Sequence, residues 1–164
     1  MIVLARVDDR LIHGLVAVAW TSHLAPETIL VANDAVANDE MKKNIMKLAK
    51  PAGVKLFIKT RDAAAKALNN PINDGKRIFL VTETIEDAAY VHGLLVHPFD
   101  TLNIGTAGIK KRPGEEYITT IPQVYMTKRD FEFAEQLHGA GVEVFCQANP
   151  TLERLEYSGI EKLF

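Results

Sequence analysis

Cysteine is almost absent from this chain, and its scarcity limits how the fold can be stabilised. A single cysteine, Cys146, occurs among 164 residues, so no disulfide can form within the chain and a disulfide-stapled scaffold is excluded. Long apolar runs are also absent, because no stretch approaches the ~20 residues that a helix needs to cross a bilayer. These two absences predict a cytoplasmic protein that meets a membrane only through a partner.

An excess of charge of either sign is missing as well. Lys and Arg number 19 against 21 Asp and Glu, which gives a formal net charge of −2. Nucleic-acid-binding domains usually carry a strongly basic patch, so nucleic acid is not an expected partner. Apolar residues make up 48% of the chain, which excludes a disordered segment and is enough for one core at this length. We expect a single domain over residues 1–164.

The common motifs of metal and nucleotide chemistry do not occur. The sequence contains no CxxC, HExxH, P-loop or GxGxxG pattern, each of which sets ligands or a phosphate cradle at a fixed spacing. His92 and His97 are five residues apart and His13 and His23 are ten apart, so neither pair shares one helical face. We therefore expect neither a metal site nor a cofactor.

Short β-branched apolar runs alternate with helix-like stretches along the chain. The runs show little polar alternation, as in strands that are covered on both faces of a parallel sheet. The predicted strands are residues 2–7, 28–32, 55–59, 77–81, 101–104 and 142–146. The predicted helices are residues 14–23, 39–49, 61–68, 85–95 and 128–138. This order predicts an α/β fold with an open, mainly parallel β-sheet and helices on both faces.

One segment interrupts this alternation. Residues 105–114 are rich in loop-forming residues, and residues 117–125 are extended with Pro122 among them. Proline cannot donate a hydrogen bond to a central ladder, so an edge strand or an antiparallel insertion is expected here. The helix that follows has Thr127 and Asp130 placed as N-cap and N3 residues, which indicates a capping arrangement at its start.

The turn after the first predicted strand concentrates charge. Residues 6–14 have the sequence RVDDRLIHG, at the end of a strand where open α/β sheets bind ligands. Gly14 lets the backbone pass close to a ligand, and the helix that begins there presents free N–H groups. An imidazole beside two guanidiniums suits phosphoryl transfer, since the neutral ring nitrogen is the nucleophile and the cations stabilise the transferred charge. A solvated charged turn is the alternative interpretation of these residue types alone.

Residues 3–18, VLARVDDRLIHGLVAV, closely resemble the phosphorylation-site segment of the IIB component of the mannose/fructose/sorbose family of the bacterial phosphotransferase system. That family's pattern is an apolar strand followed by R-[IV]-D-[DE]-R-L-I-H-G-Q-V. The resemblance continues in ILVAND at 29–34, LNIG at 102–105 and GAGVEVFCQ at 139–147. It covers essentially the whole chain in order, and it favours phosphoryl transfer over a solvated turn.

The resemblance implies a phosphocarrier with an open α/β fold. His13 is expected to accept a phosphoryl group, on Nδ1, from the phosphohistidine of a IIA protein or domain, and to pass it to a sugar at the IIC and IID membrane components. By position, Arg6 and Arg10 are expected to stabilise the phosphoryl group, and Asp9 to orient an arginine or the imidazole. For Asp8, a role in the chemistry and a purely structural role in the turn both stay open.

Further groups at the same edge complete the expected phosphoryl-binding set. Leu15 stands where the family commonly has glutamine, so backbone N–H groups are expected to replace that side-chain amide. Residues 106–108 are Thr-Ala-Gly, where the family usually has Gly or Asn and then Met, and Thr106 could supply a hydroxyl there. The expected set, besides the two arginines and Asp9, is Gly14, Leu15, Thr82, Thr84, Gly105 and Thr106.

Two other functions, and two roles for the basic run, also fit parts of the sequence. A receiver-like signalling domain also has an acidic pair after its first strand, as at Asp8 and Asp9, to hold Mg²⁺, but the third predicted strand ends at Lys59 rather than at an aspartate. A regulatory IIB-like binding module without transfer activity would fit Leu15 and the altered loop at 105–108. The basic run at 110–112 is either a solvated loop or a docking surface.

The identity of the sugar and the oligomeric state stay open. Residues 143–147 and the Pro-Thr pair at 150–151 resemble N-acetylgalactosamine-type members of the family, but mannose, fructose and sorbose also fit. A homodimer is compatible with the sequence.

Overall fold

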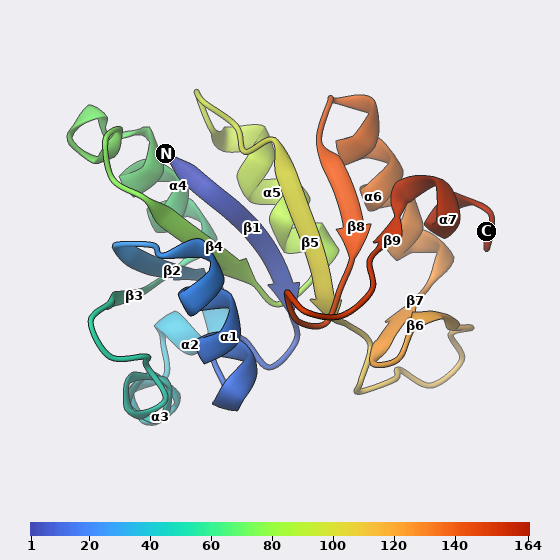
Figure 1. Cartoon of the computed structure of the whole chain (residues 1–164), viewed down its shortest axis with the longest axis horizontal. Coiled ribbons are helices and arrows are strands. Elements are labelled where there is room, and N and C mark those ends of the chain that lie inside the picture. Colours follow the sequence, from blue (N-terminus) through green and yellow to red (C-terminus); the bar gives the residue numbers. More distant parts are fainter.

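A seven-stranded sheet, in the order β3-β2-β4-β1-β5-β8-β9, forms the centre of the molecule (Figure 1). The computed structural model describes the backbone of residues 1–164 and every side chain except those of Leu15 and Val16. The strands of the sheet are β1 (Ile2–Asp8), β2 (Thr28–Ala32), β3 (Lys55–Lys59), β4 (Ile78–Thr82), β5 (Thr101–Thr106), β8 (Glu143–Cys146) and β9 (Leu155–Glu156). All pairings are parallel except that of β9, which runs antiparallel to β8. The expected open, mainly parallel sheet is confirmed.

Helices cover both faces of this sheet. They are α1 (Gly14–Leu24), α2 (Asp34–Ala37), α3 (Glu40–Leu48), α4 (Arg61–Asn69), α5 (Ile85–Leu94), α6 (Lys128–Gly139) and α7 (Tyr157–Glu161). On one face α4, α5 and α6 bury small and branched residues against the strands. On the other face α1 contributes Trp20 and Ala17 to a second cluster. The α/β class therefore follows from strands that are apolar on both sides.

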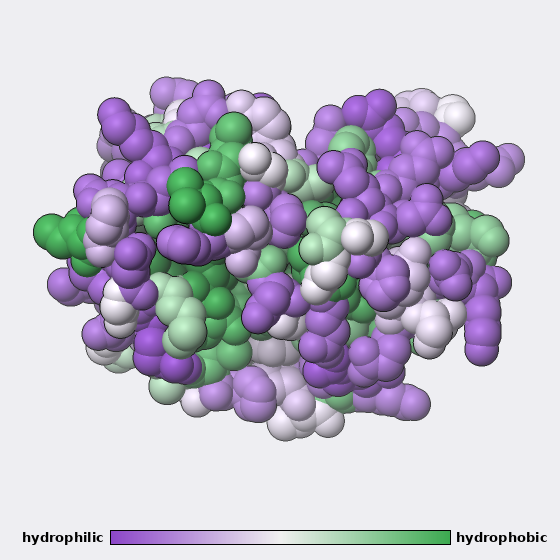
Figure 2. Space-filling model, turned by 90° about the horizontal axis from the view of Figure 1, so that it is seen from above, coloured by the Kyte–Doolittle hydropathy of each residue, from purple (hydrophilic) through white to green (hydrophobic). Residues whose placement is uncertain are grey.

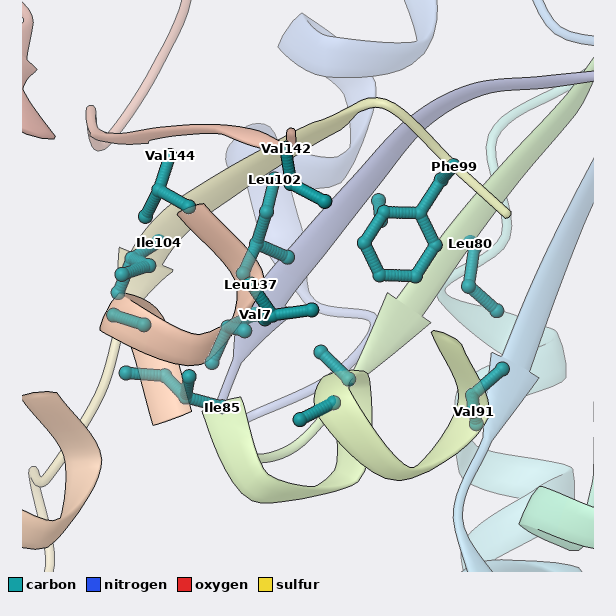
Figure 3. Packing of buried hydrophobic residues seen from close by; sticks show 14 of the residues in the cluster. Val7, Leu80, Ile85, Val91, Phe99, Leu102, Ile104, Leu137, Val142 and Val144 are labelled. Atoms are coloured by element: carbon teal, nitrogen blue, oxygen red, sulfur yellow. The ribbon is translucent and has the colours of Figure 1, made fainter. Parts of the chain in front are cut away.

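Figure 3 shows the packing on the face covered by α5 and α6. Val7 of β1, Leu102 of β5 and Leu80 of β4 are essentially inaccessible to water, and they meet Ile85 of α5 and Leu137 of α6. Burying a side chain of this size contributes about 1.5–3 kcal/mol. Since β1 lies between β4 and β5, this packing fixes the position of its carboxyl end.

The interrupted segment forms a hairpin outside the main sheet. Strands β6 (Ile118–Ile121) and β7 (Val124–Met126) pair antiparallel, which confirms the expected insertion. Pro122 lies in the turn between them and Gln123 has φ 71°, the sign that the residue after proline takes in a type II turn. One boundary was wrong, because Gly105 and Thr106 belong to β5 rather than to the loop. The predicted capping arrangement at Thr127 is confirmed as a capping box with Asp130.

Four short elements were not predicted, namely α2, β9, α7 and a 3-10 helix at Pro71–Asn73. No helix among those the structure describes is long and apolar enough to cross a membrane. Figure 2 views the molecule from the end at which β1 begins, where hydrophilic residues cover most of the surface and hydrophobic ones gather mainly over its left half. The site described next lies at the other end, where β1 finishes.

Candidate functional site

The loop between β1 and α1 is held in place by its own apolar residues. Leu11 and Ile12 are buried in the cluster beneath α1, and the Leu11 N–H donates to the carbonyl of Asp8 at 2.9 Å. Leu11 has φ 59°, a left-handed conformation that costs a non-glycine residue about 1–3 kcal/mol and persists only where surrounding contacts hold it. Asp9 donates its N–H to Thr106 of β5 at 3.0 Å. The polar side chains of this loop are therefore presented from a fixed backbone.

His13 is the N-cap residue of α1. Its backbone is extended, with φ −153°, and its side chain makes no capping hydrogen bond. The imidazole is 24% exposed, and its Nε2 lies 3.2 Å from Oδ2 of the buried Asp8. Among the described residues the structure shows no partner for the other ring nitrogen, Nδ1. One nitrogen is therefore held by a carboxylate and the other is available.

The protonation of Asp8 decides the tautomer of His13. Burial raises the pKa of this carboxyl, but the hydrogen bond with His13, the charge of Arg6 and the backbone N–H of Arg10 together outweigh burial and lower it. An ionised carboxylate only accepts hydrogen bonds. Nε2 must therefore carry the proton, which leaves the lone pair on Nδ1. Asp8, whose role the sequence left open, is thus the residue that contacts both the imidazole of His13 and the guanidinium of Arg6.

Arg6 forms a buried ion pair with Asp8. Its guanidinium is 3% exposed, and Nη2 donates to Asp8 Oδ2 at 3.1 Å and to the Ala148 carbonyl at 3.1 Å. Nη1 donates to Asn103 Oδ1 and, at 3.2 Å, to the Gln147 carbonyl. Burial lowers the pKa of Arg6 and the adjacent Asp8 carboxylate counteracts this. Through these hydrogen bonds, the side chain of Arg6 connects the ends of β1, β5 and β8.

Two neighbours confine the Arg6 guanidinium. The Trp20 ring of α1 lies 5.2 Å from its central carbon, and the indole N–H donates to the Ala148 carbonyl at 3.0 Å. On the neighbouring strand β5, Gly105 has no side chain, and a Cβ there would overlap the guanidinium. Trp20 therefore supports Arg6, and Gly105 provides the space that Arg6 needs.

Asp9 does not make the contacts that we expected of it. Its Oδ2 accepts the Ile109 N–H at 2.9 Å, whereas the contacts to an arginine and to the imidazole belong to Asp8. Its Oδ1 is buried without a hydrogen-bond partner among the described residues. Burial, together with the charges of Asp8 and Glu83, raises the pKa of Asp9. Asp9 thus ties the loop to the segment after β5.

Arg10 differs from Arg6 because it is exposed. Its backbone N–H donates to Asp8 Oδ1 at 3.0 Å, while its guanidinium has no ion-pair partner among the described side chains. Arg10 and Asp9 border a cleft of about 310 Å³ that also includes Lys110 and Arg112 of the basic run. The remaining lining residues are Glu83, Thr84, Ile85, Glu86, Ala107, Gly108, Ile109, Tyr117 and Asp130.

The threonines expected to offer hydroxyl groups at the site are either buried or hydrogen-bonded within the protein. Thr82 is buried and donates to the Thr84 carbonyl at 3.1 Å, and the Thr84 hydroxyl accepts the Asp87 N–H at 3.0 Å as the N-cap of α5. Thr106 is 2% exposed. Gly14 is exposed, with φ 44°. The side chain of Leu15 lies outside the described residues.

Two residues of this network were missed by the sequence reasoning. Asn103 is fully buried in β5, and its Nδ2 donates to the Gln147 carbonyl at 3.0 Å. Gln147 is buried at the end of β8, and its Nε2 donates to the Leu152 carbonyl at 2.6 Å. The available signal was a polar residue inside or directly after an apolar strand. Such residues are rarely buried without partners.

Comparisons with known proteins agree with this architecture. The profile of the family described as "PTS system sorbose subfamily IIB component" matches residues 2–160. A probable phosphotransferase enzyme IIB component of Streptococcus pyogenes serotype M6 is 31% identical over 160 residues, which is 96% of this chain and 98% of that protein.

Two further similar proteins differ from each other in domain composition and in the sugar that their names give. The mannose-specific EIIAB component of Escherichia coli is 30% identical over 86% of this chain, which matches 42% of that protein. The crystal structure of the IIB domain of the sorbose permease of Klebsiella pneumoniae superimposes with a TM-score of 0.90 at 26% identity, covering 100% of this chain and 98% of that domain.

Proposed function

The chain belongs to the sorbose subfamily of IIB components of the phosphotransferase system (PTS), and on this premise we propose that His13 is the residue that carries the phosphoryl group, on Nδ1. PTS IIB components are sugar-specific phosphotransferases. The observation that supports His13 is its contact with Asp8, which holds Nε2 and leaves Nδ1 as the nucleophile. The receiver-like alternative has no support from this family.

The transfer needs little covalent chemistry from the chain. The Nδ1 lone pair of His13 attacks the phosphorus of a donor phosphohistidine, a new N–P bond forms, and the donor N–P bond breaks with its electron pair returning to the donor ring. Positive charge develops on the His13 ring as the bond forms. The Asp8 carboxylate, which accepts the Nε2–H hydrogen bond, stabilises that charge, as the aspartate does in a catalytic triad.

Two features of the chain support the binding of the phosphoryl oxygens, namely the N-terminus of α1 and the side chain of Arg10. The first N–H groups of α1 have no carbonyl partner within the helix, and the helix dipole favours an anion at this end. The first turn of α1 contains no acid that would repel a phosphoryl group. Arg10 adds an exposed guanidinium from the same loop. Gly14, at the start of α1, leaves this end of the helix open.

We assign Arg6 a positioning role instead of phosphoryl contact. Its guanidinium is 3% exposed and donates to four acceptors of the protein, so it acts on His13 through Asp8. We assign Thr82, Thr106 and Gly105 structural roles as well. Thr82 and Thr106 are buried and pair with Val7 and Asp8 at the end of β1, and Gly105 leaves the space that Arg6 occupies.

The partners follow from the family. PTS IIB components work with a IIA phosphodonor and with IIC and IID membrane components, and the mannose-specific relative is named as a combined EIIAB component. We propose that this chain receives its phosphoryl group from a cytoplasmic IIA protein or domain and delivers it to a sugar at IIC and IID. His13, partly exposed at the edge of the sheet, suits two partners that bind in turn.

The test is phosphoryl uptake from phosphorylated IIA. The intact chain should incorporate about one phosphate in a form labile to acid and stable to base, as expected of phosphohistidine. His13→Ala should abolish incorporation, and His97→Ala, an exposed histidine at the other end of the molecule, should not. Absence of uptake by the intact chain would favour a IIB-like binding module without transfer activity.

A further inference from the structure

Helix α3 has a stripe of apolar side chains that is exposed to solvent. Met41, Ile45 and Leu48 are 74%, 60% and 89% exposed, and the spacing i, i+4, i+7 places them on one face of a helix. No residue of α3 is fully buried. Met46, about 140° further round the helix axis, instead packs against the core. The stripe therefore faces solvent and has no role in the packing of this chain.

Lysines flank this stripe on both sides. At 100° per residue, Lys42 lies on one side of it and Lys47 on the other, and neither has an ion-pair partner among the described side chains. Lys43 pairs with Glu40 at 3.4 Å, and Lys50 donates to the carbonyl of Val54 at 2.8 Å. The helix thus combines exposed apolar residues with two unpaired cations in a chain whose net charge is −2.

Helix α3 lies at the same end of the molecule as the loop after β1. Figure 1 shows α3 below the sheet at the lower left, and the loop after β1 runs along the same lower side. The preceding helix α2 begins directly after β2, capped by Asn33, which makes a hydrogen bond of 2.6 Å to Glu83 after β4. Helix α3 and His13 are therefore both near the carboxyl ends of the parallel strands (Figure 1).

A second protein chain is a poor match for this stripe. Stable protein interfaces bury about 800 Å² on each partner, and a helix of nine residues is only about 14 Å long. In a symmetric dimer the two helices would also place Lys42 and Lys47 of both copies close together, and like charges in contact disfavour association. An apolar stripe bordered by cations is instead the pattern of helices that lie in a membrane interface.

We propose that α3 binds the surface of an anionic lipid bilayer. Met41, Ile45 and Leu48 enter the region between headgroups and acyl chains, and Lys42 and Lys47 meet the negative headgroups on either side. A helix this short with two free lysines binds weakly and reversibly, because lipid attraction grows with buried apolar area and with the number of cations. The proposal does not depend on the assignment of His13. It replaces the expectation that the chain meets a membrane only through a partner with a direct contact, which would bring His13 close to membrane partners.

Co-sedimentation of the intact chain with vesicles tests the proposal. Binding is expected to vesicles of phosphatidylcholine and phosphatidylglycerol at 70:30, to weaken as salt screens the lysines, and to be much weaker to pure phosphatidylcholine. The Ile45→Ser/Leu48→Ser variant and the Lys42→Glu/Lys47→Glu variant should each lose about tenfold in affinity. Both pairs are exposed, so the fold and phosphoryl uptake at His13 should be unchanged.

The matched control changes exposed apolar residues at a distance from α3. Ile72 and Val96 are 74% and 71% exposed, so Ile72→Ser/Val96→Ser removes a similar apolar area and should bind vesicles normally. No binding to the anionic vesicles, equal binding to neutral ones, or equal loss in the control would overturn the proposal. So would sedimentation equilibrium showing a dimer that Ile45→Ser/Leu48→Ser converts to monomer, since a second copy would then cover the stripe.

Discussion

The guanidinium of Arg6 lies directly over the backbone of Gly105, so that a Cβ on Gly105 would overlap it. The same guanidinium holds Asp8, and Asp8 holds His13. The glycine at position 105 of β5 therefore determines, through Arg6 and Asp8, where the imidazole of His13 lies on the loop after β1.

Gly105→Ala should impair both stability and transfer. The added methyl group must displace a buried Arg6, and overpacking of this kind costs about 1–3 kcal/mol. A displaced Arg6 moves Asp8, and misplacement of a reacting group by about 1 Å lowers a rate by about 10²-fold. Urea unfolding and initial rates of phosphoryl uptake would measure the two effects. The control is Gly93→Ala in α5, where a Cβ meets open space; an equal loss there would refute the explanation.

Asp8→Asn should change the tautomer of His13. The carboxamide can donate a hydrogen bond to Nε2, which would move the ring proton to Nδ1 and block the nucleophile. By comparison with the equivalent change in a catalytic triad, the transfer rate should fall by about 10²–10⁴-fold. Nitrogen-15 NMR of histidine would show the proton on Nε2 in the natural protein. A natural protein with the proton on Nδ1 would contradict the role given to Asp8.

Arg10→Ala should slow transfer without weakening the fold. The guanidinium is exposed and unpaired among the described residues, so its removal leaves no buried charge, and the free energy of unfolding should change by less than about 0.5 kcal/mol. Loss of one cation at the phosphoryl oxygens should lower the uptake rate by about 10²–10³-fold. Lys66→Ala, an exposed cation on α4, is the control and should leave the rate unchanged.

Asp9→Asn should stabilise the protein increasingly as pH rises. Burial, with help from the charges of Asp8 and Glu83, raises the pKa of Asp9 above its ordinary value, so the folded state binds this proton more tightly than the unfolded state. The stabilisation that comes from this tighter proton binding is fully present below the ordinary pKa of about 4. It is lost as pH rises through the higher pKa that Asp9 has in the folded state. Asparagine cannot ionise and avoids that loss.

The measurement is chemical unfolding of both proteins from pH 3 to pH 7. The difference in unfolding free energy between Asp9→Asn and the natural protein should grow in favour of the variant across this range. A constant difference, or one that favours the natural protein more at high pH, would contradict the raised pKa.

The strands and long helices could be predicted because their signals are local. An apolar β-branched run such as β2, buried along its whole length, has the pattern of a strand that is covered on both faces. The short elements lacked such signals. Helix α2 has four residues and depends on a cap from Asn33, while β9 is a two-residue strand that exists because β8 offers it an edge.

The site shows the same division between local and tertiary information. His13 and Arg10 could be named as candidates because they lie in one short charged turn. The separate roles of Asp8 and Asp9 were not, since adjacent residues of one type differ only in which neighbours they meet. Arg6 looked like a phosphoryl ligand in the sequence, but Asn103 and Gln147, more than 90 residues away in the chain, take up its hydrogen bonds.

The nitrogen that carries the phosphoryl group is the most direct test of this account. The intact chain, labelled with nitrogen-15 and phosphorylated by its IIA donor, would be studied by phosphorus and nitrogen NMR, in which the N–P bond identifies the phosphorylated atom. The account predicts one phosphoryl group, on Nδ1 of His13, with Nε2 still bound to hydrogen and directed at Asp8. A phosphoryl group on Nε2 of His13, or on any other residue, would contradict it.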